Sequence, residues 1–215
     1  MSMSNLRFLT REIWRGRSVM RAFLNLRLAQ EMLRGKTIDV GGGKHADYLS
    51  FMKKDDQFEL LHYDVKTGAE IDFEKDRLPA EDGTYATVLF LNVMEHIFNH
   101  QHIANEVVRI VGPGGRLIGF TPFLMLFHGD PNDYFRYTNE ALQKILEKTG
   151  ATNTTIVPIA KGPFIAACHM IMLWFPIPLR VPLFLISYFL DVLFLKLKPS
   201  HGPRYALGYL FLVQK

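Results

Sequence analysis

Residues 37–43, with the sequence TIDVGGG, decide the fold class of this chain. A short apolar run carries Asp39 near its end and passes directly into three glycines, which is typical of a strand that turns into a helix. Glycine lets the backbone approach a ligand closely, and the free N–H groups at the start of a helix favour an anionic group. The segment therefore predicts a site for a small cofactor with an anionic part.

Asp64 strengthens this prediction, because it closes the next apolar run, residues 58–63. A carboxylate at the end of the strand beside the first one can accept hydrogen bonds from both ribose hydroxyls of an adenosine. NAD and S-adenosylmethionine (SAM) both contain this group. The spacing Gly41-x-Gly43-x-x-Ala46 also satisfies the dinucleotide fingerprint. The acids and the glycines alone thus leave the choice of cofactor open.

The rest of the chain alternates between apolar runs and helical patterns. We expect helices at residues 44–52, 101–110 and 139–149, and strands at residues 37–40, 58–63, 85–91, 116–121, 154–160 and 205–214. Strands separated by helices of about ten residues form βαβ units with right-handed crossovers and a mainly parallel sheet. The sequence therefore predicts an α/β, Rossmann-like fold with helices on both faces of the sheet.

The amino-terminal segment, residues 1–35, is predicted to form a basic amphipathic helix. Residues 1–36 carry eight lysine or arginine residues and two glutamates, although the whole chain has a net charge of only +4. Interleaved leucine, phenylalanine and tryptophan residues suit a helix at the surface of an anionic membrane. The alternative is that the apolar stripe packs on the domain and the basic face is solvated. Nucleic-acid binding is not expected, because no recognition module follows.

A second appendage, residues 162–198, is strongly apolar. It contains no charge apart from Arg180, Asp191 and two lysines near its end, and three prolines divide it into two pieces. Helices over residues 163–175 and 183–195 would each be about 20 Å long, too short for a hydrocarbon core of about 30 Å. We expect this apolar helical insertion to lie in the membrane surface or, alternatively, to form a lid or a homodimer interface.

Composition and motifs exclude several other classes. The chain has 215 residues, of which 48% are hydrophobic and 21% charged, and this excludes a disordered or collagen-like protein. A single cysteine, Cys168, excludes an internal disulfide and a thiolate zinc cluster, so we expect a reducing compartment. The sequence has no H-E-x-x-H motif and no G-x-S-x-G elbow. We therefore expect neither zinc hydrolysis nor serine acyl transfer, and no metal site.

Two further stretches resemble a known family. Residues 78–96, LPAEDGTYATVLFLNVMEH, and residues 112–118, GPGGRLI, resemble the class I SAM-dependent methyltransferases. In that family an LP-x-x-DG segment leads into an L-EH turn, and a PGG hairpin opens the next strand. The resemblance covers about residues 36–150, and it departs at Ala86, where an aspartate is usual, and at His45, where a third glycine often lies. It implies a seven-stranded Rossmann-like sheet and SAM as the cofactor.

The resemblance also implies which residues bind the cofactor. The glycine turn and the acid before it would hold the methionine part, and the acid after the next strand would bind the ribose. An Asp-Phe pair would flank the adenine, and an asparagine after the fourth strand would lie beside the sulfonium, unless it is only a turn former. In this order the residues are Asp39, Gly41, Gly42, Gly43, Asp64, Asp72, Phe73 and Asn92.

Residues 128–138, HGDPNDYFRYT, are similar to a segment of bacterial methyltransferases linked to cell-surface glycan or lipid pathways. The segment follows a strand at the carboxyl edge of the predicted sheet, where ligands bind in doubly wound folds. Tyr134 is one candidate for the acceptor site. Asp133 would orient a base or bind the acceptor, and Arg136 would engage a phosphate or carboxylate. The alternative is a salt bridge between Asp133 and Arg136 that holds the loop closed.

His96 and His128 are the candidate bases, because a hydroxyl acceptor must lose a proton. Methyl transfer is an in-line displacement in which positioning does most of the work. A histidine with its reference pKa of about 6.5 suits the proton transfer. The sequence does not choose between the two, and His96 has the alternative role of bracing the turn before the next helix.

We therefore expect a cytoplasmic SAM-dependent methyltransferase, peripheral on the inner face of the cell membrane, that acts on an oxygen of a lipid-linked, glycan or other amphiphilic acceptor. The alternatives are a methyltransferase for a soluble small molecule, an inactive membrane-associated binding protein of the same fold, and an NAD oxidoreductase. The expected parts are the amino-terminal helix (1–35), the SAM-binding core (36–161), the apolar insertion (162–198) and a final strand that completes the core (199–215).

Overall fold

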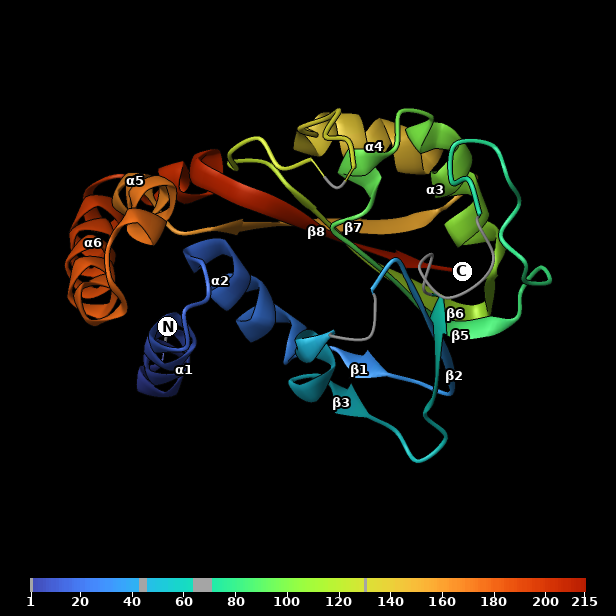
Figure 1. Ribbon diagram of the computed structural model, residues 1–215, viewed down its shortest axis with the longest axis horizontal. Helices are drawn as coiled ribbons and strands as arrows, with labels where there is room; N and C mark the ends of the chain where they lie inside the picture. Colours follow the sequence, from blue (N-terminus) through green and yellow to red (C-terminus); the bar gives the residue numbers. More distant parts are fainter. Residues whose placement is uncertain (1, 43–45, 64–70, 130) are drawn as a thin grey trace.

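The computed structural model describes residues 2–42, 46–63, 71–129 and 131–215 (Figure 1). Within these residues the main sheet has six strands in the order β4-β2-β5-β6-β8-β7, and β1 and β3 form a separate parallel pair. The strands are β1 (Met32–Leu33), β2 (Lys36–Val40), β3 (Lys53–Lys54), β4 (Glu59–Tyr63), β5 (Tyr85–Leu91), β6 (Val111–Pro122), β7 (Asn153–Ala160) and β8 (Ala206–Gln214).

The helices pack on both faces of this sheet. They are α1 (Met3–Trp14), α2 (Val19–Leu28), α3 (His100–Arg109), α4 (Asn139–Glu147), α5 (Pro163–Ile171) and α6 (Ile177–Leu197). The 3-10 turns are η1 (Asp47–Ser50), η2 (Met94–His96), η3 (Met172–Trp174) and η4 (Pro199–Tyr205). In Figure 1, α3 and α4 lie on one side of the sheet and α2 on the other, while α1, α5 and α6 gather at one end of the molecule.

The directions of the strands determine where the candidate site lies in the sheet. β2 pairs in parallel with β4 and β5, and β5 pairs in parallel with β6, so the carboxyl ends of these four strands share one edge. β8 runs antiparallel between β6 and β7. The predicted α/β, Rossmann-like fold is thus confirmed, with six main-sheet strands in the described residues where seven were expected. Each of the six predicted apolar runs contributes a strand.

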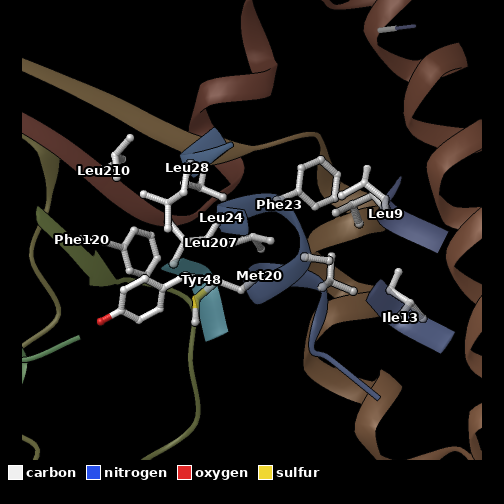
Figure 2. Packing of buried hydrophobic residues seen from close by; sticks show 14 of the residues in the cluster. Leu9, Ile13, Met20, Phe23, Leu24, Leu28, Tyr48, Phe120, Leu207 and Leu210 are labelled. Carbon is white, nitrogen blue, oxygen red and sulfur yellow. The ribbon is translucent and has the colours of Figure 1, made fainter. Parts of the chain in front are cut away.

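The amino-terminal segment forms two helices, where one was expected. The chain turns at Gly16, whose φ of 86° belongs to the left-handed region that favours glycine. Figure 2 shows the apolar side of α2, with Met20, Phe23 and Leu24, between the sheet and Leu9 of α1. Burial of each such side chain stabilises the fold by about 1.5–3 kcal/mol. The apolar stripe of α2 therefore serves the core, which was the alternative to a role at a membrane.

The prediction of a helix over residues 44–52 was wrong for the part of this segment that the structure describes, where only the single 3-10 turn η1 forms. Asp47 in this turn pairs with Arg17 and with Arg21, the latter at 2.7 Å, and Tyr48 is buried against the sheet. These tertiary contacts, which lie far away in the sequence, override the local helical pattern.

The apolar insertion forms α5, η3 and α6. The expectation that each of its pieces is too short to cross a membrane was wrong for the second, because α6 has 21 residues, including an internal Pro182. Proline is tolerated in the first turn of a helix, where its missing N–H is not needed, and Pro182 removes only one later backbone bond. Within the described part of the chain, α6 is the one helix long and apolar enough to span a membrane, and 22% of its most apolar window is buried.

Candidate functional site

Asp39, the residue before the last in strand β2, is fully buried. The hydroxyl of Tyr48 in η1 donates a hydrogen bond to its carboxylate. Burial and the neighbouring Asp39 raise the pKa of Tyr48 above its ordinary value, so the hydroxyl keeps its proton and remains a donor. The carboxylate is thus held in one orientation at the end of the strand.

The turn after β2 has no room for side chains. Gly41 has φ of +89°, and a Cβ atom there would lie 2.5 Å from Val93 Cγ2. A Cβ atom on Gly42 would lie 1.9 Å from Asp39 Oδ2. The glycines therefore let the backbone pass close to the Asp39 carboxylate and to Val93, directly after the end of β5. Gly43 lies outside the described residues.

Asn92 follows β5 and has φ of 55°, the only positive φ among the described residues other than glycine. Its backbone N–H donates to Phe120 O in β6 at 2.9 Å, which holds the turn after β5 against the neighbouring strand. Asparagine adopts this conformation more readily than most residues. The geometry agrees with both expectations for Asn92, a turn former and a residue at the cofactor edge.

Of the residues expected to bind adenine and ribose, the structure describes only some. Asp72 is exposed, and its carboxylate accepts from the Glu74 N–H at 3.0 Å and pairs with Lys75 at 3.1 Å. Phe73 packs against the apolar cluster beneath α3 and α4. Asp64, the expected ribose ligand, lies outside the described residues. Asp72 therefore stabilises its own turn, while the ring of Phe73 is fixed by the core.

His96 and His128, the two candidate bases, lie together. Their ring centroids are 5.3 Å apart, although His96 ends η2 and His128 belongs to the loop after β6. His96 Nδ1 lies 2.5 Å from Asn132 O, and because a carbonyl oxygen only accepts, this nitrogen carries the hydrogen. His96 is largely buried, whereas His128 is exposed. His128 is therefore the histidine that an acceptor can reach.

Asp133 and Arg136 form the salt bridge that was the alternative for these residues. Each guanidinium Nη atom of Arg136 lies 2.5 Å from one Asp133 carboxylate oxygen. The guanidinium holds the pKa of Asp133 below its ordinary value, so the acid is ionised. Asp133 also accepts from the backbone N–H of His128 at 2.8 Å, and Arg136 donates to Leu126 O at 3.3 Å. The pair thus fixes the backbone that carries His128.

Tyr134 and Glu95 complete the cluster. Tyr134 is 45% exposed, and its ring lies edge-on to Phe98 with centroids 5.4 Å apart. Its backbone N–H donates to Glu95 O at 2.9 Å, which joins the loop to η2. Sequence reasoning missed Glu95, whose side chain is buried beside His96. The available signal was its place in the L-EH turn, but an acid in a turn is usually exposed.

The described residues contain no group of three or more His, Cys, Asp or Glu side chains arranged to hold a metal ion. A buried carboxylate and a glycine turn end β2, and an exposed imidazole, a phenol and a fixed ion pair lie after β5 and β6. Such an edge can hold a cofactor on one side and accept a proton on the other.

Known proteins share this fold. The sequence profile of the family described as "Methyltransferase domain" matches residues 13–156. The cyclase SpnF has 15% identity and a TM-score of 0.54, over 92% of this chain and 80% of its own. A phosphoethanolamine N-methyltransferase from Haemonchus contortus, in complex with SAM, has 15% identity and a TM-score of 0.53. That match covers 91% of this chain but 52% of the Haemonchus chain, so this chain spans about half of that protein.

A SAM-dependent methyltransferase from Archaeoglobus fulgidus is matched almost end to end, over 97% of this chain and 99% of its own, with 13% identity and a TM-score of 0.51. No curated protein matches the chain. At such identities the solved structures show the fold, and the presence of a cyclase among them means that the fold alone does not fix the reaction.

Proposed function

Because the chain belongs to the methyltransferase domain family and is a SAM-dependent methyltransferase, we propose that it methylates an oxygen of an amphiphilic acceptor at a membrane surface. The acceptor class is a lipid-linked molecule, such as a lipid-linked glycan, whose apolar chain stays in the membrane. The observation that carries the proposal is the short stretch of chain between the apolar end of the molecule and His128.

The apolar end is the surface formed by α5, η3 and α6, and its large side chains are exposed. Trp174 is 83% exposed, Leu197 81% and Phe189 68%. Apolar patches of this extent on a soluble protein mark a surface that meets a membrane or a partner. Figure 1 shows these helices as one block at the end of the molecule, beside α1.

Tryptophan and arginine residues border the apolar end. A Cβ atom on Gly16 would lie 4.0 Å from Ile177 Cδ1, so the end of α1 meets the start of α6. Trp14 in the last turn of α1 is 59% exposed, and Arg11 beside it is exposed and makes no ion pair within the described residues. Tryptophan and basic residues together are typical of the lipid headgroup layer, where each cation adds about 1 kcal/mol on an anionic surface. This charge favours an anionic lipid surface over a second copy of the chain.

The loop that carries His128 starts in the core beneath the apolar end. His169 of α5 donates from its ring to Leu124 O at 3.0 Å, and Leu124 packs against the core cluster that includes α5 and α6. Leu126 and Phe127 are then 55% and 83% exposed, directly before His128. Four residues span at most about 14 Å. The loop that carries His128 is therefore tied to α5, the first helix of the apolar end, within a few residues of His128.

The proposed reaction assigns each group a task. SAM supplies a methyl group on a positively charged sulfur, so the protein needs mainly to align the acceptor. Asp39, Gly41 and Gly42 would hold the methionine part. The exposed ring of His128 accepts the hydroxyl proton of the acceptor at a ring nitrogen, and the Asp133–Arg136 pair keeps the backbone of His128 in place.

Vesicle co-sedimentation of the full chain tests the membrane part of the proposal. We expect binding to phosphatidylglycerol vesicles that weakens in high salt and on phosphatidylcholine vesicles. The double variant Trp174→Ser/Phe189→Ser should bind at least about fivefold more weakly, because two exposed anchors are lost. Leu61→Ser, which changes an exposed apolar residue on β4, is the matched control.

Equal binding by the double variant and wild type would contradict the proposal. So would a concentration-dependent dimer, seen without vesicles, that the double variant abolishes, because the apolar end would then be a homodimer interface. The acceptor class is tested by incubating the protein with methyl-labelled SAM and vesicles of total lipid extract. Label in the organic phase supports the proposal, and label only in small water-soluble molecules contradicts it.

A further inference from the structure

A row of polar side chains crosses the sheet close to the amino end of β5, whereas the candidate cofactor site lies at the carboxyl end. Arg116 of β6 pairs with Thr87 of β5 and with Gln214 of β8. Gln214 in turn pairs with Asn153, the first residue of β7. Residues that pair directly across strands carry their side chains on the same face of a sheet. The row therefore presents a guanidinium, a hydroxyl and two amides on one face.

A cavity of about 230 Å³ lies against this row. Arg116, Asn153 and Gln214 line it, together with Arg34 from the segment before β2. The Thr87 hydroxyl accepts from the Arg34 N–H at 3.0 Å and donates to Arg34 O at 3.1 Å, which fixes the backbone of Arg34 beside the row. No aspartate or glutamate among the described residues lines the cavity. Two arginines and two amides thus meet around one small space.

The guanidinium of Arg116 is only half used. Its Nη1 atom donates to Glu31 Oε2 at 3.1 Å, whereas Nε and Nη2 are buried and have no hydrogen-bond partner within the described part of the chain. Nε and Nη2 form the edge of a guanidinium whose two parallel N–H groups match two oxygens of a phosphate or carboxylate. Buried donors without partners are costly. This edge of Arg116 would therefore gain from an anion.

The charge around the cavity is positive. Arg34 is exposed, and its side chain makes no ion pair or hydrogen bond with the residues that the structure describes. Glu31 divides its charge between Arg116 and Arg27, whose Nη1 atom lies 2.6 Å from Glu31 Oε1. Burial and the neighbouring Arg34 lower the pKa of Arg116 from its ordinary value. The group contains three guanidinium ions and one carboxylate, and a phosphate dianion would balance the excess.

We propose that this cavity binds the phosphate group of a small soluble molecule. The free edge of Arg116 donates to two phosphate oxygens, and Arg34 donates to a third. Because Nε and Nη2 of Arg116 are covered, binding requires a side-chain shift, which the exposed and unpaired Arg34 side chain is free to make. Figure 1 shows the carboxyl end of β8 far from α5 and α6, so a soluble ligand suits this site better than a lipid headgroup. The site requires neither the acceptor nor the membrane of the proposed function.

Titration of the isotope-labelled full chain with inorganic phosphate, at constant ionic strength, tests the proposal. Amide resonances around Arg116 should shift with a dissociation constant of about 1 mM or lower. Arg34→Gln should weaken binding about tenfold, because one charge-assisted contact is lost. Arg7→Gln, an exposed substitution on α1 that removes the same charge, should bind like wild type. Glycerol 3-phosphate should produce the same shifts, acetate should bind more weakly, and phosphatidic acid vesicles should leave these resonances unchanged.

Three results would overturn the proposal. Equal binding by Arg34→Gln and wild type would mean that phosphate binds elsewhere, and vesicles that shift the Arg116 region would make the ligand a lipid. Absence of any phosphate effect would mean that the carboxyl group of Lys215, whose O accepts from the Gly114 N–H at 2.8 Å beside the cavity, already balances the arginines. Arg116→Gln should abolish binding; if it fails to fold, Arg34→Gln decides, because Arg34 contacts the fold through its backbone.

Discussion

Asp191 of α6 accepts a hydrogen bond from the backbone N–H of Phe164 in the first turn of α5, at 3.0 Å. The N–H of Ile165 donates to the other carboxylate oxygen, also at 3.0 Å. The first N–H groups of a helix have no partner within the helix, and Gly162 at the start of α5 offers no side chain to cap them. The one acid of the apolar insertion is therefore a cap supplied by the neighbouring helix.

Replacing Asp191 by alanine should destabilise the protein. Two backbone donors, one buried and one partly buried, would lose their acceptor, which costs about 1–3 kcal/mol of unfolding free energy. Urea denaturation of the full chain measures this loss. Asp191→Asn keeps one acceptor oxygen and should lose less. Equal stability of the alanine variant and wild type would show that water satisfies these donors instead.

Gly42→Ala should weaken SAM binding at least about tenfold, which corresponds to about 1.4 kcal/mol. The new Cβ atom would occupy the position of the Asp39 carboxylate, which must then move. Isothermal titration calorimetry gives the dissociation constant. Gly150→Ala is the control, because Gly150 has φ of +81° and open space around its Cβ position, so it strains the backbone without touching the site. An unchanged dissociation constant for Gly42→Ala would remove the glycine turn from the cofactor site.

His169→Leu should loosen the loop that carries His128. The substitution leaves Leu124 O without its donor, and an unsatisfied buried carbonyl costs about 1–3 kcal/mol. Amide hydrogen exchange over residues 122–129 should therefore be faster in the variant than in wild type. His169→Gln retains an N–H donor and should restore part of the protection. Exchange that rises equally throughout the chain would instead indicate global destabilisation.

The residues that meet at the carboxyl edge of the sheet could be predicted from the sequence, because the order of elements along the chain determines which residues follow each strand. His96 and His128 each follow a strand, β5 and β6, and these strands pair in parallel. The ends of adjacent parallel strands lie side by side, so two motifs distant in sequence meet at one site. The same reasoning placed Asp39 and the glycine turn at this edge, because β2 is the other neighbour of β5.

Contacts between side chains of distant elements could not be predicted in this way. The local pattern at residues 44–52 is helical, but Tyr48 is drawn into the core and bonds Asp39. Asp133 and Arg136 each suited an acceptor site, and only the geometry shows that they bind each other. In the sequence, Glu95 looks like an ordinary exposed acid in a turn. Burial of a side chain outside a long helix or strand leaves no periodic pattern of apolar residues that would reveal it.

The stability of the protein should fall as pH rises through the range in which Glu95 titrates. Burial raises the pKa of Glu95 from 4.5 to about 7 in the folded protein, so the folded state holds this proton more tightly than the unfolded state. Below about pH 4.5 the acid is protonated in both states, and the unfolding free energy contains no penalty from it. Between pH 4.5 and 7 the penalty grows to about 1–3 kcal/mol, and above pH 7 it stays constant.

Glu95→Gln isolates this effect, because the amide has a similar shape and does not titrate. Its unfolding free energy, minus that of wild type, should therefore rise by about 1–3 kcal/mol between pH 4.5 and 7.5. Urea denaturation at several pH values measures the difference, and Glu140→Gln, exposed on α4, corrects for the change in net charge. Parallel curves for Glu95→Gln and wild type would mean that the acid is already ionised at low pH in the folded protein, through a closer contact with Arg136 or His96.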